Sequence, residues 1–175
     1  MNPIRSIMLL GGARSGKSRM AQELALKFTS RPLYLATSRR WDDEHAARIE
    51  RHRKDRGPEW TTIEEPLELS QVTAEHPVIV VDCVTLWLTN VFESAGYDLD
   101  GALAIARAEV DRCLTQPKTW IWVSNELGQG VHAETQSGRR FVDLQGFVNQ
   151  HLAAHVDTVA LLVAAIPLII KGNLP

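Results

Sequence analysis

The sequence predicts an α/β layered domain with a mainly parallel sheet. Short apolar runs without polar alternation recur along the chain, which is typical of strands buried on both faces. Segments with helical periodicity lie between several of these runs, and parallel neighbours need the crossover that a helix supplies. A length of 175 residues and a hydrophobic content of 45% suit one core, so residues 1–175 are predicted to form a single domain.

Six apolar runs are predicted to form strands. Each is short and is bounded by turn-forming or polar residues, and they cover residues 4–10, 33–36, 78–82, 120–124, 159–166 and 168–171. Pro167 separates the last two runs, so a tight reversal is predicted there. The final run is then expected to be an antiparallel edge strand near the C-terminus.

Three segments have the periodicity of amphipathic helices, namely residues 17–28, 99–114 and 140–155. In the first segment Met20, Leu24 and Phe28 recur at four-residue spacing and form one apolar stripe. The least regular stretches are residues 38–77 and 125–140, and no repeat or interdomain linker is visible.

The composition argues against several classes of protein. A formal net charge of -2 does not suit a protein that coats nucleic acid, so the basic run at 48–56 is expected to act on a small anion. Only Cys83 and Cys113 are present, which argues against a disulfide framework or structural zinc and favours the cytoplasm. No signal peptide is apparent, and the longest apolar run, 159–170, is too short to span a bilayer.

A phosphate-binding loop is the strongest local motif. The sequence GGARSGKS fits G-x-x-x-x-G-K-[ST], and it follows a predicted strand and opens a predicted helix. Lys17 is expected to reach the β- and γ-phosphates, and the Ser18 hydroxyl is expected to ligate Mg²⁺. The predicted nucleotide-binding residues of the loop are Gly11, Gly12, Ala13, Arg14, Ser15, Gly16, Lys17 and Ser18. The motif predicts a P-loop NTPase-type (RecA-like) three-layer domain.

Polar residues follow other predicted strands at the same sheet edge, where ligands of open parallel sheets collect. Thr37 and Ser38 follow the second strand, the third ends at Asp82, and Ser-Asn-Glu at 124–126 follows the fourth. Asp82 suits the acidic position that holds magnesium in phosphate-loop proteins. A strand-terminal aspartate also suits the N-cap of a following helix, so both interpretations stay open.

The basic run ARIERHRKDR, residues 47–56, contains His52 among cations. A histidine nucleophile needs an unprotonated nitrogen, and neighbouring positive charges lower the imidazole pKa. Arg48 and Arg56 lie four residues to either side and would share the face of His52 on a helix, where they would also stabilise phosphate charge. The simpler alternative is an amphipathic helix whose cations complement its C-terminal dipole.

The motif blocks resemble one known family in their order. LYLATS, DDEHAARIERHRKDR, VVDCVTLWLTN and VSNELGQGV follow the phosphate loop as in the bifunctional adenosylcobinamide kinase/adenosylcobinamide-phosphate guanylyltransferase family of cobalamin biosynthesis. The resemblance implies that ATP or GTP phosphorylates adenosylcobinamide. It also implies that GMP passes from GTP, through a GMP-histidine intermediate, to adenosylcobinamide phosphate, giving adenosyl-GDP-cobinamide and pyrophosphate.

The resemblance also implies roles for individual residues. The family's R-I-x-x-H pattern falls on Arg48, Ile49 and His52, so His52 is the inferred guanylylated residue, and Lys17 is the second catalytic residue. Further nucleotide contacts are implied at Thr37, Ser38, Arg39, Arg53, Lys54, Asp55, Arg56, Glu64 and Asp82. Ser18 and Asp82 are implied to hold Mg²⁺. The implied partners are a corrinoid and a nucleotide in a homotrimer, with no nucleic acid and no membrane span.

One departure and two alternatives limit this interpretation. The family commonly has Pro-Glu-Asn after its glycine-rich loop, where this chain has Ala133-Glu134-Thr135, so the corrinoid-binding residues are not predicted. The chain could instead be a plain P-loop small-molecule kinase without a covalent intermediate. It could also be a RecA-like nucleotide-dependent binding protein, in which hydrolysis drives an interaction.

The remaining aromatic and histidine residues are assigned no site role. Tryptophans beside apolar runs usually bury area, so a core position is predicted for Trp60, Trp87, Trp120 and Trp122. Ordinary polar positions are predicted for His45, His76, His132, His151 and His155.

Overall fold

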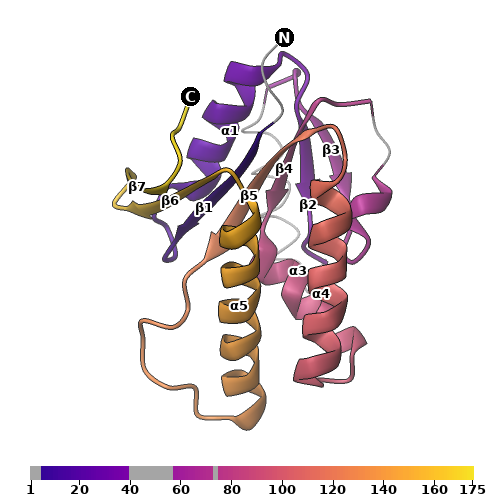
Figure 1. Ribbon diagram of the computed structural model, residues 1–175, viewed down its shortest axis with the longest axis vertical. Coiled ribbons are helices and arrows are strands. Elements are labelled where there is room, and N and C mark those ends of the chain that lie inside the picture. The colour runs from indigo at the N-terminus through magenta and orange to yellow at the C-terminus, as the bar shows by residue number, and fades with distance from the viewer. Residues whose placement is uncertain (1–4, 40–56, 73–74) are drawn as a thin grey trace.

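A seven-stranded sheet dominates the computed structural model, which describes residues 5–39, 57–72 and 75–175. The strand order is β3-β2-β4-β5-β1-β6-β7 (Figure 1). The strands are β1 (Ser6–Gly11), β2 (Leu33–Ala36), β3 (Thr61–Glu64), β4 (Val78–Asp82), β5 (Thr119–Asn125), β6 (Thr158–Val163) and β7 (Ile166–Lys171). All neighbours pair in parallel except β6 and β7, which confirms the predicted antiparallel strand at the C-terminal edge.

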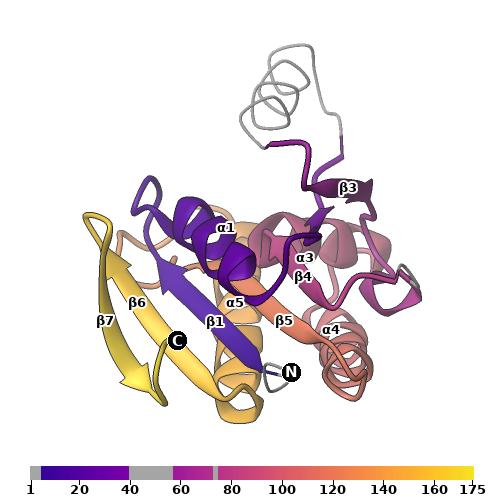
Figure 2. The same cartoon turned by 90° about the horizontal axis from the view of Figure 1, so that it is seen from above.

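Helices cover both faces of the sheet, as the predicted three-layer domain requires. Helix α1 (Lys17–Phe28) lies on one face, and α3 (Val84–Ser94), α4 (Leu99–Leu114) and α5 (Gln136–His155) lie on the other (Figure 2). A short 3-10 helix, η1 (Leu69–Gln71), precedes β4. Among the described residues, no helix is both long and apolar enough to cross a membrane.

Burial on both faces explains the continuous apolar runs of the strands. In β1, Ile7 and Leu9 pack on the α1 side, whereas Met8 packs on the side of α3, α4 and α5. All three side chains are fully buried, so neither face of this strand has room for a polar residue. The predicted core tryptophans are confirmed, because Trp87, Trp120 and Trp122 are buried and Trp60 packs against the α1-side cluster.

Two elements were missed by the sequence prediction. Strand β3 lies in the stretch 38–77 that looked irregular, because it has four residues and both of its end residues are exposed. Helix α3 was missed because its sequence VTLWLTNVFES is rich in β-branched and apolar residues, which favour strands in isolation. Most of this helix is buried, so it lacks a broad polar face that would reveal a helical period.

The reversal between β6 and β7 occurs before the predicted position. Val163 pairs with Ile166, so Ala164 and Ala165 form a two-residue turn in which φ is 51° and 65°. Positive φ at both central residues is the type I′ geometry that matches strand twist. Prediction of the turn at Pro167 was therefore wrong, and this proline is instead the second residue of β7. An edge strand tolerates proline because one side of its backbone has no partner strand.

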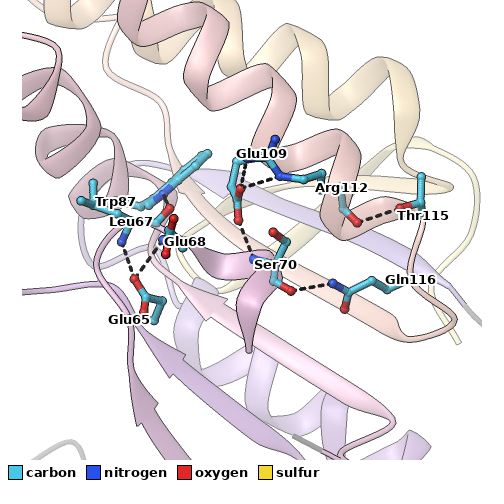
Figure 3. A network of polar contacts seen from close by, with 9 residues as sticks. All are labelled: Glu65, Leu67, Glu68, Ser70, Trp87, Glu109, Arg112, Thr115 and Gln116. Atoms are coloured by element: carbon cyan, nitrogen blue, oxygen red, sulfur yellow. Dashed lines mark hydrogen bonds and ion pairs between the residues drawn. The ribbon is translucent and has the colours of Figure 1, made fainter. Parts of the chain in front are cut away.

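A polar network fixes the segment between β3 and β4 against the helices (Figure 3). The buried carboxylate of Glu109, on α4, accepts a hydrogen bond from the Ser70 N–H at 2.5 Å and pairs with Arg112. The Gln116 side chain donates to the Ser70 carbonyl at 2.8 Å. Because both backbone groups of Ser70 bind the α4 region, η1 is held directly on that helix.

The same segment also contacts α3 (Figure 3). The Trp87 indole N–H donates to the Leu67 carbonyl at 3.0 Å. Glu65 closes the turn before it, since its Oε1 accepts the N–H groups of Leu67 and Glu68, each at 2.9 Å. The chain leaving β3 is thus fixed to two helices within a few residues of the sheet edge.

Glu109→Ala is expected to lower the free energy of unfolding by about 1–3 kcal/mol, because it leaves the Ser70 N–H without its buried acceptor. Urea denaturation measures the change. The matched control is Glu23→Ala, which removes an exposed pair with Arg19 and is expected to cost less than about 0.5 kcal/mol. Equal effects of the two substitutions would contradict the structural role of Glu109.

Candidate active site

Strand register aligns polar residues along the carboxyl edge of the sheet. Ala36 of β2 pairs with Glu64 on one side and with Asp82 on the other. Further along, Gly11 at the end of β1 pairs with Asn125 at the end of β5. Neighbouring strands lie about 4.8 Å apart, so these strand ends form one continuous row of candidate ligand groups.

The phosphate loop has a backbone that requires glycine at its first position. Gly11 has φ of 154°, and a Cβ there would lie 2.5 Å from the Leu162 carbonyl oxygen and 2.8 Å from Ser15 Oγ. Gly16, with φ of 92°, is the N-cap residue of α1 and lies against Ala165. The Ala165 N–H also donates to the Ser15 carbonyl at 2.9 Å, so the β6–β7 turn supports the loop from outside.

Lys17 is buried at the first position of α1 and points back across the loop. Its Nζ donates to the Gly11 carbonyl at 2.9 Å, the Gly12 carbonyl at 2.6 Å and Ser15 Oγ at 3.3 Å. Burial lowers the pKa of Lys17, while the Asp82 carboxylate acts to raise it. Asp82 is therefore close enough to act electrostatically on the loop lysine, which brings β4 and the phosphate loop into one site.

Asp82 is available to a ligand because it does not cap the next helix. The N-cap of α3 is Cys83, and no side chain forms a capping hydrogen bond there. Ser18 is the second residue of α1, in the first turn above the loop. A carboxylate and a hydroxyl are oxygen ligands of the kind that Mg²⁺ prefers, so the chemistry of this donor pair fits magnesium.

Cys83 lies beside this carboxylate but is not a nucleophile at neutral pH. Burial raises the pKa of its thiol to about 11, and the charge of Asp82 adds to the effect. The thiol therefore stays protonated.

Thr37 joins the ends of β2 and β4 instead of pointing freely into the site. Its hydroxyl donates to the Cys83 carbonyl at 2.7 Å and accepts the Cys83 N–H at 3.0 Å. The Thr37 carbonyl accepts a hydrogen bond from Asn90 Nδ2 at 2.8 Å, and Asn90 is fully buried on α3. These contacts fix the backbone that carries Asp82. Sequence reasoning missed Asn90, although one amide within the apolar helix segment was a usable signal.

The other predicted residues of the β2 and β3 ends lie at this edge. Ser38 Oγ donates to the Arg39 carbonyl at 3.1 Å, and the Arg39 guanidinium pairs with Glu93 of α3 at 3.1 Å. Glu64 ends β3 and is exposed. The partly exposed Arg39–Glu93 pair orients the chain where it leaves the sheet.

A buried amide network, also missed from the sequence, supports the end of β5. The Ser124 hydroxyl donates to Asn149 Oδ1 at 2.6 Å, and Gln145 Nε2 donates to both side chains at 3.0 Å. Asn149 Nδ2 donates to the Asn125 carbonyl at 3.1 Å. The Asn125 amide in turn donates to Thr85 Oγ1, at 3.0 Å, linking β5 to the start of α3.

A hollow of about 380 Å³ lies between the chain after β5 and helix α5. It is lined by Leu127, Gly128 and residues 130–133 of that chain segment, together with Arg139, Val142 and Asp143. The Glu126 N–H donates to the Gly11 carbonyl at 3.1 Å, which places the start of this stretch at the loop.

The predicted histidine nucleophile is not among the residues that the structure describes. The residues in this group are Arg48, Ile49, His52, Arg53, Lys54, Asp55 and Arg56. Their predicted roles stay predictions.

Comparison with known proteins identifies the family. The family model described as "Cobinamide kinase / cobinamide phosphate guanyltransferase" matches residues 7–170. The chain belongs to this family. Membership confirms the predicted bifunctional kinase and guanylyltransferase of adenosylcobalamin biosynthesis, in preference to a plain kinase or a nucleotide-dependent binding protein.

Relatives of this family match nearly the whole chain. The bifunctional adenosylcobalamin biosynthesis protein CobP of Pseudomonas aeruginosa is 39% identical over 172 residues, which cover 95% of this chain and 97% of that protein. The CobU protein of Escherichia coli K12 is 37% identical and covers 94% of this chain and 99% of its own length.

A solved structure bears on the fold alone. The flagellar accessory protein FlaH of Methanocaldococcus jannaschii aligns with a TM-score of 0.52 and 15% identity. The match covers 97% of this chain and 79% of that one. It supports the predicted RecA-like fold class.

Gly11→Ala is expected to lower the free energy of unfolding by at least about 2 kcal/mol, because the added Cβ meets backbone in a conformation that L side chains rarely adopt. Gly12→Ala is the matched control, since nothing lies within 4 Å of a Cβ there. Its effect is expected to stay below about 1 kcal/mol. Urea denaturation without nucleotide compares the two variants. Similar losses in the free energy of unfolding would refute the claim that position 11 has no room for a side chain.

Proposed function

We propose that residues 1–175 act as one domain that carries out both family reactions on adenosylcobinamide, with ATP or GTP as phosphate donor and GTP as GMP donor. The observation that carries the proposal is the phosphate loop, with buried Lys17 under the electrostatic influence of Asp82. The family match over residues 7–170 supplies the substrate class. One continuous sheet joins the first strand to the last pair, which supports a single domain.

In the kinase reaction, the aminopropanol hydroxyl of adenosylcobinamide attacks the γ-phosphorus of the bound triphosphate. The new bond joins that oxygen to phosphorus, the bond to the β–γ bridging oxygen breaks, and the nucleoside diphosphate leaves while the hydroxyl loses its proton. Lys17 is proposed to exchange its hydrogen bonds with Gly11 and Gly12 for bonds to phosphate oxygens. The N-terminus of α1 adds N–H donors for the same anion.

Ser18 and Asp82 are proposed to hold Mg²⁺, which supplies charge neutralisation to the phosphates when bound. Thr37 supports this role indirectly, because its hydroxyl fixes the backbone of Cys83, next to Asp82. Arg39 and Glu64 are proposed to contact nucleotide from the neighbouring strand ends, together with Ser38.

In the guanylyl transfer, a neutral ring nitrogen of His52 is proposed to attack the α-phosphorus of GTP. A nitrogen–phosphorus bond forms, the bond to the bridging oxygen breaks, and pyrophosphate leaves. An oxygen of adenosylcobinamide phosphate then attacks the same phosphorus, and the electron pair of the nitrogen–phosphorus bond returns to the imidazole. The nucleotide and its phosphates are proposed to be held by the residues that follow the histidine, namely Arg53, Lys54, Asp55 and Arg56.

The hollow between the chain after β5 and α5 is proposed to receive part of the corrinoid. Ala133, the first residue of the segment that departs from the family pattern, lines it, and Arg139 fixes that segment by donating to the carbonyls of Ala133 and Glu134 at 3.0 and 2.8 Å. A volume of about 380 Å³ suits a side arm better than a whole corrinoid.

A homo-oligomer, a trimer by family resemblance, is proposed to assemble through β7. Half of the large exposed apolar side chains in the described chain lie between Val163 and Ile170. Ile166, Leu168 and Ile170 are 71%, 62% and 59% exposed and lie on one face of an edge strand. Such a strand on a free monomer would favour uncontrolled association, and a second copy of the chain offers the matching surface.

The cytoplasm is the proposed compartment. Cys83 and Cys113 are both free thiols, as expected in a reducing environment.

GTP labelled at the α-phosphate is expected to leave acid-labile, alkali-stable label on the denatured protein, and His52→Asn is expected to lose it while still phosphorylating adenosylcobinamide. The matched control is His76→Asn, since His76 is a partly exposed histidine whose Nδ1 contacts the Arg31 carbonyl. This control is expected to label normally. Unchanged labelling of His52→Asn would refute the nucleophile, whereas an active kinase that never labels would favour the plain kinase.

Leu168→Lys is expected to shift the chain toward monomer, because it places a charge within the apolar face of β7. Light scattering after size-exclusion chromatography measures the mass. Ile105→Lys on α4 is the matched control, as Ile105 is a similarly exposed apolar residue away from β7, and it is expected to leave the mass unchanged. A monomeric wild-type chain, or dissociation by the control alone, would exclude this interface.

A further inference from the structure

Two histidines and an aspartate meet at the sheet edge opposite the phosphate loop. His151 and His155 are one turn apart at the C-terminal end of α5, and Asp111 faces them from α4. One ligand atom from each of the three side chains lies within 4.8 Å of the other two. Helix α5 ends just before β6 begins, so the cluster lies at the amino ends of the strands.

The contacts within this cluster orient both imidazoles. His151 Nε2 lies 2.7 Å from Asp111 Oδ1, and the two rings have centroids 4.4 Å apart. His155 Nδ1 lies 2.8 Å from the His151 carbonyl oxygen. A carbonyl only accepts, so Nδ1 of His155 carries the hydrogen and Nε2 carries the lone pair. Backbone fixation of one ring nitrogen is the usual support for a histidine that binds metal through the other.

The chemistry of the three groups selects a class of metal ion. Imidazole nitrogens at positions i and i+4 of a helix, with one carboxylate, match the ligands of Zn²⁺, whereas Mg²⁺ and Ca²⁺ prefer oxygen ligands alone. Tetrahedral coordination at about 2.0–2.1 Å requires a nitrogen–oxygen separation of about 3.3 Å. Nε2 of His151 carries a hydrogen toward the Asp111 carboxylate, so zinc binding must move that proton to Nδ1 and lengthen the 2.7 Å contact by about half an ångström. Asp111 is exposed on the surface, which leaves it free to make this shift.

The end of α5 attracts cations, and one cation of the chain already binds there. Carbonyl groups accumulate at a helix C-terminus and attract positive charge. Lys171 of β7 binds the carbonyls of Ala153 and Ala154 at 2.9 and 3.0 Å, which leaves the His151 carbonyl to orient His155.

We propose that Asp111, His151 and His155 form a zinc-binding site that ties α4 to α5. Three protein ligands leave a fourth position for water. The site lies at the amino ends of the strands, whereas the phosphate loop lies at their carboxyl ends. Bound zinc therefore stabilises the folded chain instead of taking part in phosphoryl transfer. The two helices pack against one another along the core, and the ion joins them at the surface where that packing ends.

The full-length chain, treated with EDTA and then transferred to a buffer that does not bind metal, tests the site by calorimetric titration with zinc chloride. We expect zinc to bind the unmutated chain saturably and to raise its Tm. One of the zinc sites is expected to be absent when a residue of the cluster is substituted. Asp111→Asn and His155→Ala are each expected to weaken that site about tenfold or more and to abolish the rise in Tm. Magnesium alone is expected to give neither effect at this cluster.

The matched control is His76→Ala, which removes a partly exposed histidine whose Nδ1 also contacts a backbone carbonyl. Its zinc binding is expected to equal that of the unmutated chain. His155→Gln is a second variant that removes the same zinc ligand with a smaller change in side-chain size. The Tm of each variant in EDTA shows whether that variant still folds. Zinc binding that survives both Asp111→Asn and His155→Ala would overturn the proposal, as would an EDTA-treated chain that binds no zinc.

Discussion

The contact between Gly11 and the β6–β7 hairpin is the constraint on which the candidate site depends. Gly11 ends β1 between β5 and β6, and it leaves no room for a side chain against the Leu162 carbonyl. The hairpin turn then adds a hydrogen bond from the Ala165 N–H to the Ser15 carbonyl. A phosphate loop alone is only a glycine-rich turn, and here two neighbouring strands hold it in shape before any anion binds.

The same principle applies elsewhere along the sheet edge, where the ends of β2 and β5 are each fixed by a buried amide from the helical layer. Asn90 of α3 binds the Thr37 carbonyl, and Asn149 of α5 binds the Asn125 carbonyl. Burying an amide costs free energy, and the Asn90 Oδ1 has no hydrogen-bond partner among the described residues, so the two bonds from Nδ2 offset that cost only in part. The helices beneath the edge thus fix the backbone of residues at the candidate site.

Prediction from sequence succeeded where a signal is local. The phosphate loop is one contiguous motif, and strands such as β4 are recognisable because they are buried on both faces. It failed for β3 and α3, whose sequences do not show the period of the element they form. What Asn90 and Gln145 bind could not be predicted, for a different reason. Their partners are distant in sequence, so only the folded chain reveals what they bind.

Helix α1 contacts the sheet through very small side chains. Ala21 and Ala25 are fully buried, and they set how closely the helix approaches β1, β4 and β5. Lys17 begins this helix, and Asp82 ends one of those strands. The methyl groups of these two alanines therefore help to set the spacing between the Lys17 ammonium and the Asp82 carboxylate. A larger residue at either alanine would move the helix outward as a rigid body and widen that spacing without altering either charged group.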